Sequence, residues 1–534
     1  MALSTKIKVT LPTSGIIVRR DGKHNYVYKV LRTYRNEKGQ PTNDRRLIGR
    51  LDEESGMLIP NDTYFQFYEY DDSAMVEVLP CIDAVRSIGS SYLIGRILES
   101  LGIPAMLRGV FGDSRANKLI TASSFMACQG NVMEGILDWC KDHTMLSEAL
   151  SDQVASSLFA SITHEEKMAF FRAWTACLKT PAYLSYDVTS FSTYAKAIGE
   201  AEWGYNRDGD KLPQINLGLY MGQKSGLPVF YTCYGGSIVD KSHLPYMMAY
   251  NQELGISDVT FIMDKGFCTQ ANIIYMHENH YAYIMGVEIR HAGTAQAILA
   301  VRDDICSMRK RIRAGIYADS IRSTFYGVNT CMHIYFDPLL GERQRADLYR
   351  EVEAQEEILV QLELLSKRQF RHYLAYFDID RKQDGSFTFV RSYTKIDEAA
   401  RSAGFFCLLS STTLSANQVL SAYRGKDMIE KGFDNLKNHI DMKRLHTRNM
   451  ETTEGKLFTA FIALIAIAQI EANLGEYMRE KSMSKDALIK ELDRVKVIYT
   501  SNNKRLMNPL TKTQRSILAS FGISEDDLKA YVAG

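Results

Sequence analysis

The feature that most constrains this chain is the order of strand-like and helix-like segments between residues 182 and 288. Three apolar runs of strand character come first, AYLSYDVTS, QINLGLYM and LPVFYTCYGG, with turn residues between Gly222 and Gly226. A helical stretch near Leu244 to Leu254, the strand VTFIMD, a helix near Thr269 to Asn279 and the strand YAYIMGV follow. The predicted order is β-β-β-α-β-α-β, which indicates a mixed sheet covered by helices.

That order is the one of an RNase H-like core, and the chain is long enough to carry more than this core. It has 534 residues, whereas a single hydrophobic core stops growing near ~250–300 residues. We predict a multi-domain α/β protein whose mixed-sheet core contains an insertion and follows a small β-rich domain and a helical domain. The expected limits are 1–78 (basic, β-rich), 79–180 (helical), 181–288 (core, first part), 289–402 (insertion), 403–475 (core, second part) and 476–534 (helical tail).

The two N-terminal regions are candidates for nucleic-acid contact. Residues 15–49 alternate apolar and polar positions around turns at Asp21-Gly22 and Lys38-Gly39, as in a small antiparallel sheet whose Arg and Lys side chains could meet phosphates. From about 83 to 178 the apolar spacing is helical. We expect this helical domain to contribute to DNA binding, and plain helical packing remains an equal alternative.

Composition excludes several classes of protein. Lys and Arg number 64 against 63 Asp and Glu, so the net charge of +1 supplies no global attraction to nucleic acid, and DNA contact must come from local patches. The start lacks the apolar segment of a secretory signal. The apolar segment Leu457 to Ile470 is too short for a membrane span and predicts a buried core helix. Nine cysteines without a CxxC pair predict reduced core thiols and a cytosolic compartment.

Two aspartates stand out in the strand-like segments. Asp187 lies within LSYDVTS, and Asp264 directly follows VTFIM, so each carboxylate belongs to a strand that we expect to be buried. A charge there costs several kcal/mol unless it is paired or bound to metal. A lone aspartate in such a place is usually a turn former or a helix cap. Two of them in one sheet favour a metal site.

The other acidic residues of this region have a plainer interpretation. Asp208, Asp240, Asp258 and Glu288 lie in loop or cap contexts, where a solvated or capping role is the better hypothesis.

A third acidic residue lies on a long helix that we predict from about Ser415 to Asn438. Tyr423, Lys426, Glu430 and Lys437 stand at offsets of 0, 3, 7 and 14, which places them within roughly a 60° arc of a helix with ~100° per residue. The neighbouring apolar stripe would dock the helix on the sheet and leave Glu430 facing the strand ends. An ordinary amphipathic helix with exposed charges would show the same spacing.

The segment YRGKDMIEKGFDNLK resembles the Y-x2-R-x3-E-x6-K signature of bacterial insertion-sequence DDE transposases, with Tyr423, Lys426, Glu430 and Lys437 at its four positions. Lys426 stands where the family usually has Arg, which weakens a bidentate phosphate grip and keeps the charge. The region after Asp187, including G-Y-x-x-D at 204–208, and DKGF at 264–267 are similar to the family's two aspartate motifs. The resemblance covers about 180–475, with a weaker likeness at the N-terminus.

The resemblance implies a two-metal RNase H-like enzyme that binds terminal inverted repeats and assembles as a homodimer on double-stranded DNA. Asp187, Asp264 and Glu430 would hold two Mg²⁺ ions, with Mn²⁺ as a substitute, because hard carboxylates suit these cations. Tyr423, Lys426 and Lys437 would position DNA phosphates near the cut. The basic run Lys443, Arg444, His446 and Arg448 could follow the DNA backbone, and a solvated helix end is an equal alternative.

The leading hypothesis is therefore a transposase that cleaves DNA and transfers the freed 3′ end to a target, in the bacterial cytoplasm at the nucleoid. One alternative is an RNase H-like endonuclease without strand transfer. Another is a domesticated DNA-binding protein that no longer catalyses, although all three acidic positions are present.

Overall fold

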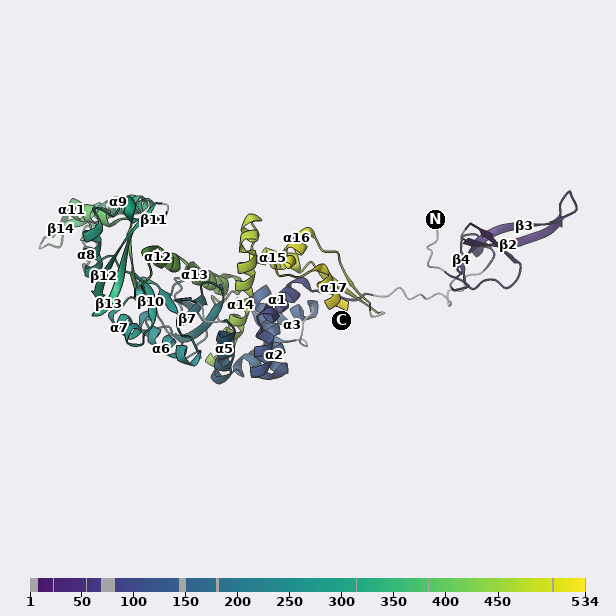
Figure 1. Cartoon of the computed structure of the whole chain (residues 1–534), viewed down its shortest axis with the longest axis horizontal. Helices are drawn as coiled ribbons and strands as arrows, with labels where there is room; N and C mark the ends of the chain where they lie inside the picture. Colours follow the sequence, from purple (N-terminus) through teal and green to yellow (C-terminus); the bar gives the residue numbers. More distant parts are fainter. Residues whose placement is uncertain are drawn as a thin grey trace. The chain divides into compact units, whose positions relative to one another are not determined.

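The computed structural model describes residues 8–22, 24–53, 55–68, 82–143, 150–178, 182–313, 315–382, 384–501 and 504–533. The chain divides into two compact units (Figure 1), one of residues 1–84 with 499–504 and one of residues 85–498 with 505–534. The domain limits expected at 78–79 and 180–181, and the thiol of Cys81, lie outside the described residues. The other expected limits stay predictions.

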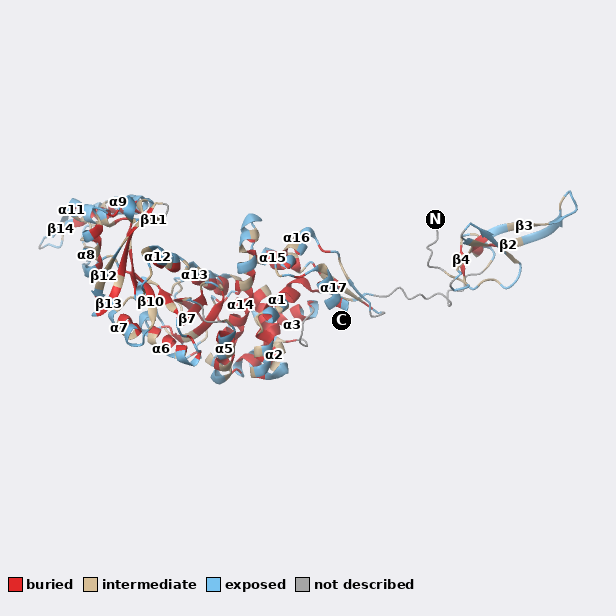
Figure 2. Cartoon of the chain, in the orientation of Figure 1, coloured by how far each residue is buried: buried red, intermediate tan, exposed pale blue. Residues whose placement is uncertain are grey.

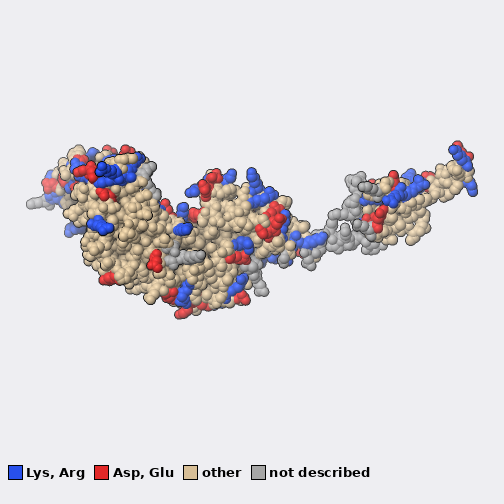
Figure 3. Space-filling view, in the orientation of Figure 1, with Lys and Arg blue, Asp and Glu red and all other residues tan. Residues whose placement is uncertain are grey.

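The first unit is the small basic antiparallel sheet that the N-terminal pattern predicts. Its strands are β1 (Ile16–Asp21), β2 (His24–Arg35), β3 (Pro41–Leu51) and β4 (Leu58–Pro60), in that order. Val27, Ile48 and Leu58 form the core with Tyr64. The far half of the β2–β3 hairpin extends beyond this core and is exposed (Figure 2). Lys and Arg side chains gather along it (Figure 3).

A helical group in the second unit is built around one central helix, α14 (Met450–Glu480). The group consists of α1 (Gly89–Ser100), α2 (Ile103–Gln129), α3 (Ile136–Asp142), α4 (Asp152–Ala160) and α5 (His164–Leu178). α14 packs directly against α1, α2 and α4. Phe458 on α14 contacts the rings of Phe111, Phe170 and Phe171, so residues far apart in sequence share one core.

The apolar segment expected at Leu457 to Ile470 belongs to a longer helix than we predicted. α14 has 31 residues and contains a window of 18 residues with a mean hydropathy of 1.8, so among the described helices it alone has the length and composition to cross a membrane. In the structure, 78% of that window is buried inside the protein. The burial agrees with the predicted core helix, and the expectation that the segment is too short was wrong.

A nine-stranded mixed sheet forms the other part of the second unit, in the order β11-β12-β13-β16-β10-β9-β6-β7-β8. β6 (Tyr183–Ser192), β7 (Gln214–Gly222) and β8 (Pro228–Gly235) make the predicted antiparallel meander. β9 (Thr260–Met263) and β10 (Ala282–Val287) continue it as parallel strands. β16 (Phe405–Ser410) pairs with β10 in the antiparallel sense.

The region expected to be an insertion contributes to the same sheet. β11 (Arg311–Arg313), β12 (Ile316–Phe325) and β13 (Val328–Phe336) extend the sheet beyond β16. The rest forms α8 (Ala292–Val301), α9 (Pro338–Gln361), α10 (Lys367–Tyr373), the hairpin β14 (Phe377–Arg381) and β15 (Phe387–Arg391), and α11 (Tyr393–Ser402). The parts around Phe377 have a small hydrophobic cluster of their own.

The C-terminal tail differs from the prediction, which was a tail made of helices alone. It contains α15 (Lys485–Leu492), α16 (Lys512–Ala519) and α17 (Glu525–Ala533), and also the strands β17 (Lys496–Thr500) and β18 (Arg505–Met507). These strands form a three-stranded sheet with β5 (Ile82–Ser87).

The helices on the large sheet are arranged so that one pair meets the ends of the central strands. α6 (Asp240–Glu253) and α7 (Gln270–Glu278) lie on one side, and α12 (Ala416–Arg424) and α13 (Asp427–Asp434) lie on the other (Figure 1). Ile262 of β9 packs with Val419 and Leu420 of α12. Because side chains alternate along a strand, Asp264, two residues after Ile262, points to the same face.

The single helix predicted from Ser415 to Asn438 is wrong, because α12 and α13 are separated at Gly425 and Lys426 and α13 ends in a π-helical turn at Asn435–His439. A tertiary contact accompanies the break. The side chain of Gln223, in the β7–β8 turn, donates to the carbonyl of Ala422 (2.8 Å), which a continuous helix would bond to the amide of Lys426. That amide donates to Tyr423 instead (3.1 Å).

Candidate active site

Asp187 and Asp264 lie side by side at the centre of the large sheet. β6 and β9 are adjacent parallel strands, and their register pairs Tyr186 with Met263, so the next residues along the two strands are Asp187 and Asp264. Neighbouring strands lie about 4.8 Å apart, and two residues in register point to the same face. The two carboxylates therefore occupy one place beneath α12 and α13.

Asp187 is a carboxylate that water solvates poorly. One of its oxygens accepts a hydrogen bond from the amide of Val188 (2.8 Å). Burial raises the pKa of Asp187 to about 6, and the neighbouring charge of Asp264 adds to the increase. The amide of Val188 and the ammonium of Lys426 act in the opposite direction and do not compensate fully. The negative charge of Asp187 is thus only partly compensated by its surroundings, and a bound cation would stabilise it.

The α12–α13 segment brings Tyr423, Lys426 and Glu430 to these aspartates. The ammonium of Lys426 donates to a carboxylate oxygen of Asp264, and the Tyr423 hydroxyl donates to the same oxygen (3.1 Å). Lys426 also lies 3.5 Å from a carboxylate oxygen of Glu430. Burial alone would lower the pKa of Lys426, but the carboxylates of Asp264, Asp187 and Glu430 together outweigh burial and raise it. The ammonium therefore contacts two of the three carboxylates, those of Asp264 and Glu430, and feels the charge of the third, Asp187.

A glycine on β10 makes room for the tyrosine. A Cβ atom placed on Gly286 would lie 2.8 Å from the Tyr423 hydroxyl oxygen, which is closer than real contacts allow. The hydroxyl occupies that space and reaches Asp264 from there. Burial and the nearby carboxylates raise the pKa of Tyr423, so the phenol keeps its proton and can donate it in this hydrogen bond.

The donor set suits a divalent cation, although the side chains must move to hold one. Among the residues that the structure describes, no three His, Cys, Asp or Glu side chains are arranged to hold a metal ion as they stand. However, Asp264 and Glu430 both contact the same cationic group, the Lys426 ammonium, and Asp187 is buried beside them. The Glu430 side chain is 62% exposed, so little packing holds it away from the aspartates.

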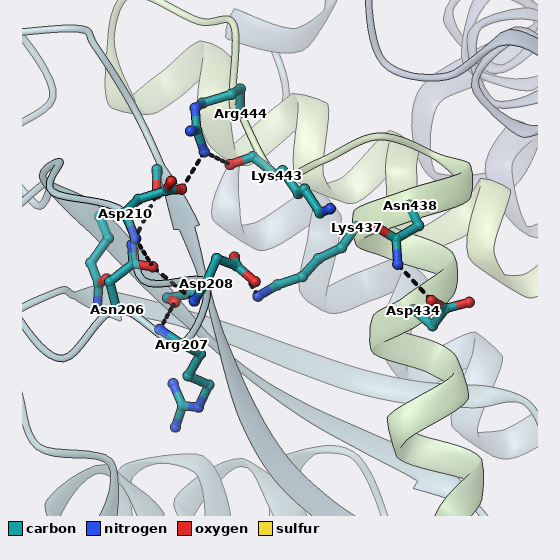
Figure 4. Close-up of polar contacts among 12 residues, drawn as sticks. Asn206, Arg207, Asp208, Asp210, Asp434, Lys437, Asn438, Lys443 and Arg444 are labelled. Carbon is teal, nitrogen blue, oxygen red and sulfur yellow. Dashed lines mark hydrogen bonds and ion pairs between the residues drawn. The ribbon is translucent and has the colours of Figure 1, made fainter.

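Lys437 lies in a different environment from the other residues of its motif. It sits in the π-helical turn, and its ammonium donates to Asp208 (2.7 Å) in the loop between β6 and β7 (Figure 4). The side chain of Lys437 is only 10% exposed, and that of Asp208 is 24% exposed. The 60° arc expected of a straight helix therefore does not describe how Lys437 is placed.

The basic run after Lys437 is not a helix end, because residues 441–449 form an irregular segment between the π-helical turn and α14. The carbonyl of Lys443 accepts from the amide of Ser192 (3.1 Å), which ties the segment to the end of β6. Arg444 donates to Asp210 (2.6 Å), while Lys443 and Arg448 are exposed. His446, also exposed, has a left-handed backbone conformation (φ 49°).

Sequence reasoning missed the part played by the acidic loop residues. Asp208 and Asp210 are ion-pair partners of Lys437 and Arg444 rather than solvated side chains. Asp240 accepts from Arg207 and from the Tyr234 hydroxyl (2.8 Å). The G-Y-x-x-D segment was the signal available for Asp208, but its partner lies more than two hundred residues away in the chain.

The other two acidic residues that we interpreted as solvated or capping lie apart from this loop. Glu288 pairs with Lys265 (3.0 Å), and Asp258 adopts a left-handed backbone conformation (φ 55°).

Comparison with known proteins identifies the family of the chain. The family model for the transposase DDE domain matches residues 181–466, which include Asp187, Asp264 and the whole α12–α13 segment. No curated protein matches the chain. Among solved structures, the chain is similar to the piggyBac transposase in a synaptic complex with hairpin DNA, at 9% identity and a TM-score of 0.34, over 83% of this chain and 82% of that one. Because the family model covers more than half of its length, the chain belongs to the transposase DDE domain family.

Proposed function

We propose that this protein is an insertion-sequence transposase that binds terminal inverted repeats and cleaves and joins DNA through two metal ions held by Asp187, Asp264 and Glu430. The observation that carries the proposal is the grouping of these three carboxylates. Asp187 and Asp264 are neighbours on two adjacent parallel strands, and the Lys426 ammonium joins Asp264 to Glu430. The order of β6 to β10 supports an RNase H-like core, and the family match supports the chemistry.

The acidic cluster is suited to Mg²⁺, with Mn²⁺ as a substitute, because carboxylate oxygens are the ligands that these cations prefer. When bound, two such ions stabilise the attacking and the leaving oxygen of a phosphodiester together. Asp187 and Asp264 would hold them from the sheet and Glu430 from α13. The Tyr423 hydroxyl holds Asp264 in its orientation through a hydrogen bond, and Lys426 offsets one of the cluster's negative charges.

DNA would reach this cluster along the cations beside it. Lys443 and Arg444 lie at the end of β6, Lys437 contacts the loop that follows this strand, and Arg448 comes four residues after Arg444. Phosphate groups are partners for such cations. The basic β2–β3 hairpin of the first unit has the dimensions of a two-stranded ribbon, a shape that the major groove admits. We further propose that two copies of the chain act together on the paired transposon ends, in the bacterial cytoplasm.

The test is cleavage of a labelled duplex that carries the element's own terminal repeat and flanking DNA, with Mg²⁺ or with EDTA. The protein is compared with Glu430→Gln and with Asp427→Asn, which removes an exposed carboxylate from the same helix without touching the cluster. We expect nicking at the repeat boundary that needs Mg²⁺, is lost in Glu430→Gln and persists in Asp427→Asn. Activity that survives in Glu430→Gln would remove Glu430 from the site.

Transfer of the freed 3′ end to a second duplex separates a transposase from an endonuclease. We expect joined products in the same reaction. Cleavage without joined products would support the endonuclease, and repeat binding without cleavage by any of the three proteins would support a DNA-binding protein that no longer catalyses.

A further inference from the structure

Two carboxylates of one loop cover two of the cations that we assign to DNA. Asp208 contacts Lys437 at 2.7 Å and Asp210 contacts Arg444 at 2.6 Å, and both carboxylates come from the five residues Asn206–Asp210 (Figure 4). A carboxylate and a phosphate oxygen offer a cation the same kind of partner, a charged acceptor. The carboxylates of the loop thus occupy the positions beside Lys437 and Arg444 that the phosphates of a bound DNA backbone would need.

The loop is held in this conformation by its own hydrogen bonds. The side-chain oxygen of Asn206 accepts from the amides of Asp208 (2.9 Å) and Asp210 (3.2 Å), and its amide group donates to Ser192 at the end of β6 (2.9 Å). Arg207 is anchored to Asp240 on α6. These bonds hold the backbone of the loop where the two aspartates face Lys437 and Arg444, and the Ser192 hydroxyl also donates to Asp210 (3.1 Å).

We propose that Asp208 and Asp210 occupy phosphate positions, and that backbone phosphates of bound DNA replace them on Lys437 and Arg444. The proposal rests on the proposed function, since DNA is the partner. The Asn206–Asp210 loop then acts as an electrostatic guard: its two carboxylates compete with DNA phosphates for Lys437 and Arg444. The competition lowers the affinity of the protein for any DNA that cannot displace both carboxylates. The opposite arrangement, in which the aspartates stay in place and orient the cations for DNA, predicts opposite effects of the same substitutions.

Counterion release measures the exchange directly. Each phosphate that a lysine or arginine neutralises releases about 0.9 counterion, and the logarithm of the binding constant falls with the logarithm of salt concentration by that amount. When a phosphate displaces a carboxylate from its lysine or arginine, the carboxylate is left without a partner beside the DNA. It then attracts a cation from solution, and this uptake offsets the release. Removing the carboxylate therefore makes the salt dependence steeper, by about one unit for each aspartate.

The experiment measures binding of a labelled duplex to the full-length protein by fluorescence anisotropy over a range of salt concentrations. The variants are Asp208→Asn, Asp210→Asn and, as the matched control, Asp434→Asn, which removes a nearby carboxylate that bonds to Asn438 (2.6 Å) and not to Lys437. We expect each of the first two to bind DNA roughly three- to tenfold more tightly at low salt, with a steeper slope. The control should bind with the slope of the unmodified protein.

If Asp208→Asn and Asp210→Asn bind DNA no more tightly than the unmodified protein, and with the same salt dependence, the proposal that these carboxylates compete with phosphates is wrong. Failure of all proteins to bind DNA would instead overturn the proposed function on which the guard rests.

Discussion

Two charged clusters lie on the same sheet, and they differ in how their charges balance. In the acidic cluster, the three carboxylates of Asp187, Asp264 and Glu430 have one nearby ammonium, that of Lys426, which contacts Asp264 and Glu430. In the loop cluster, Asp208 and Asp210 each have a cation of their own, Lys437 and Arg444. The acidic cluster has an excess of negative charge and can accept further cations, whereas the loop cluster is neutral and can bind an anion only by exchanging one.

The largest expected effect separates the two clusters by chemistry. We expect Asp187→Asn to reduce the rate of DNA cleavage at saturating DNA by at least ~10²–10³-fold, as the loss of one group that stabilises a transition state does. Asp208→Asn removes one carboxylate as well, but it should leave the cleavage rate of bound DNA within a fewfold. Single-turnover cleavage measures both, and equal losses in the two variants would mean that the clusters form one site.

The pH dependence of stability should differ in direction between the clusters. The pKa of Asp187 is raised from 3.8 to about 6, so the folded protein holds this proton more tightly than the unfolded chain. The stabilisation is present below pH 4 and is lost as pH rises to about 6, by at most about 3 kcal/mol. In EDTA, urea unfolding should show this loss in the unmodified protein and not in Asp187→Asn. A stability difference between the unmodified protein and Asp187→Asn that does not change from pH 4 to 6 would contradict the assignment.

Close packing around the acidic cluster provides a third test, which concerns the stability of the folded protein. A Cβ on Gly286 would meet the Tyr423 hydroxyl, so Gly286→Ala should destabilise the protein by about 1–3 kcal/mol, as overpacking does. Removing the hydroxyl in Gly286→Ala with Tyr423→Phe should recover part of this loss. Gly266, beside Asp264, has open space where its Cβ would lie, so Gly266→Ala is the matched control for thermal unfolding. Equal effects of both alanines would refute the close packing.

The smallest effect belongs to the loop cluster. The hydrogen bond from Arg444 lowers the pKa of Asp210, so this carboxyl stabilises the folded protein above its ordinary pKa of 3.8 and loses that effect as pH falls. The direction is opposite to that for Asp187. Comparing Asp210→Asn with the unmodified protein between pH 3 and 6 should show a small deficit that disappears at the acid end.

Sequence reasoning succeeded where local pattern decides the structure. The strands that carry Asp187 and Asp264 follow from apolar runs and turn residues, and the order of β6 to β10 is confirmed. It failed where a distant group intervenes. Helical spacing from Ser415 to Asn438 gives no sign that the helix is interrupted at Gly425 and Lys426, where the distant side chain of Gln223 donates to the carbonyl of Ala422.

The placement of the cations shows the same limit. Tyr423 and Lys426 reach Asp264, but the break in the helix and the π-helical turn direct Lys437 to Asp208. The ion pairs of Asp208 and Asp210 join segments more than two hundred residues apart, and spacing along one helix cannot report on them. Neither could the apolar pattern of β11 to β13 reveal that these strands join the large sheet.

The position of α14 has a consequence for how the chain folds as it is synthesised. The helices of residues 89–178 pack around a helix that begins at Met450, so their apolar faces stay uncovered until most of the chain has left the ribosome. Contacts over such a separation form slowly, and the exposed surface meanwhile invites aggregation. The family match ends at residue 466, inside this helix. A fragment cut at that limit would lose half of the helix that closes the N-terminal core, and for expression the whole chain is the unit to produce.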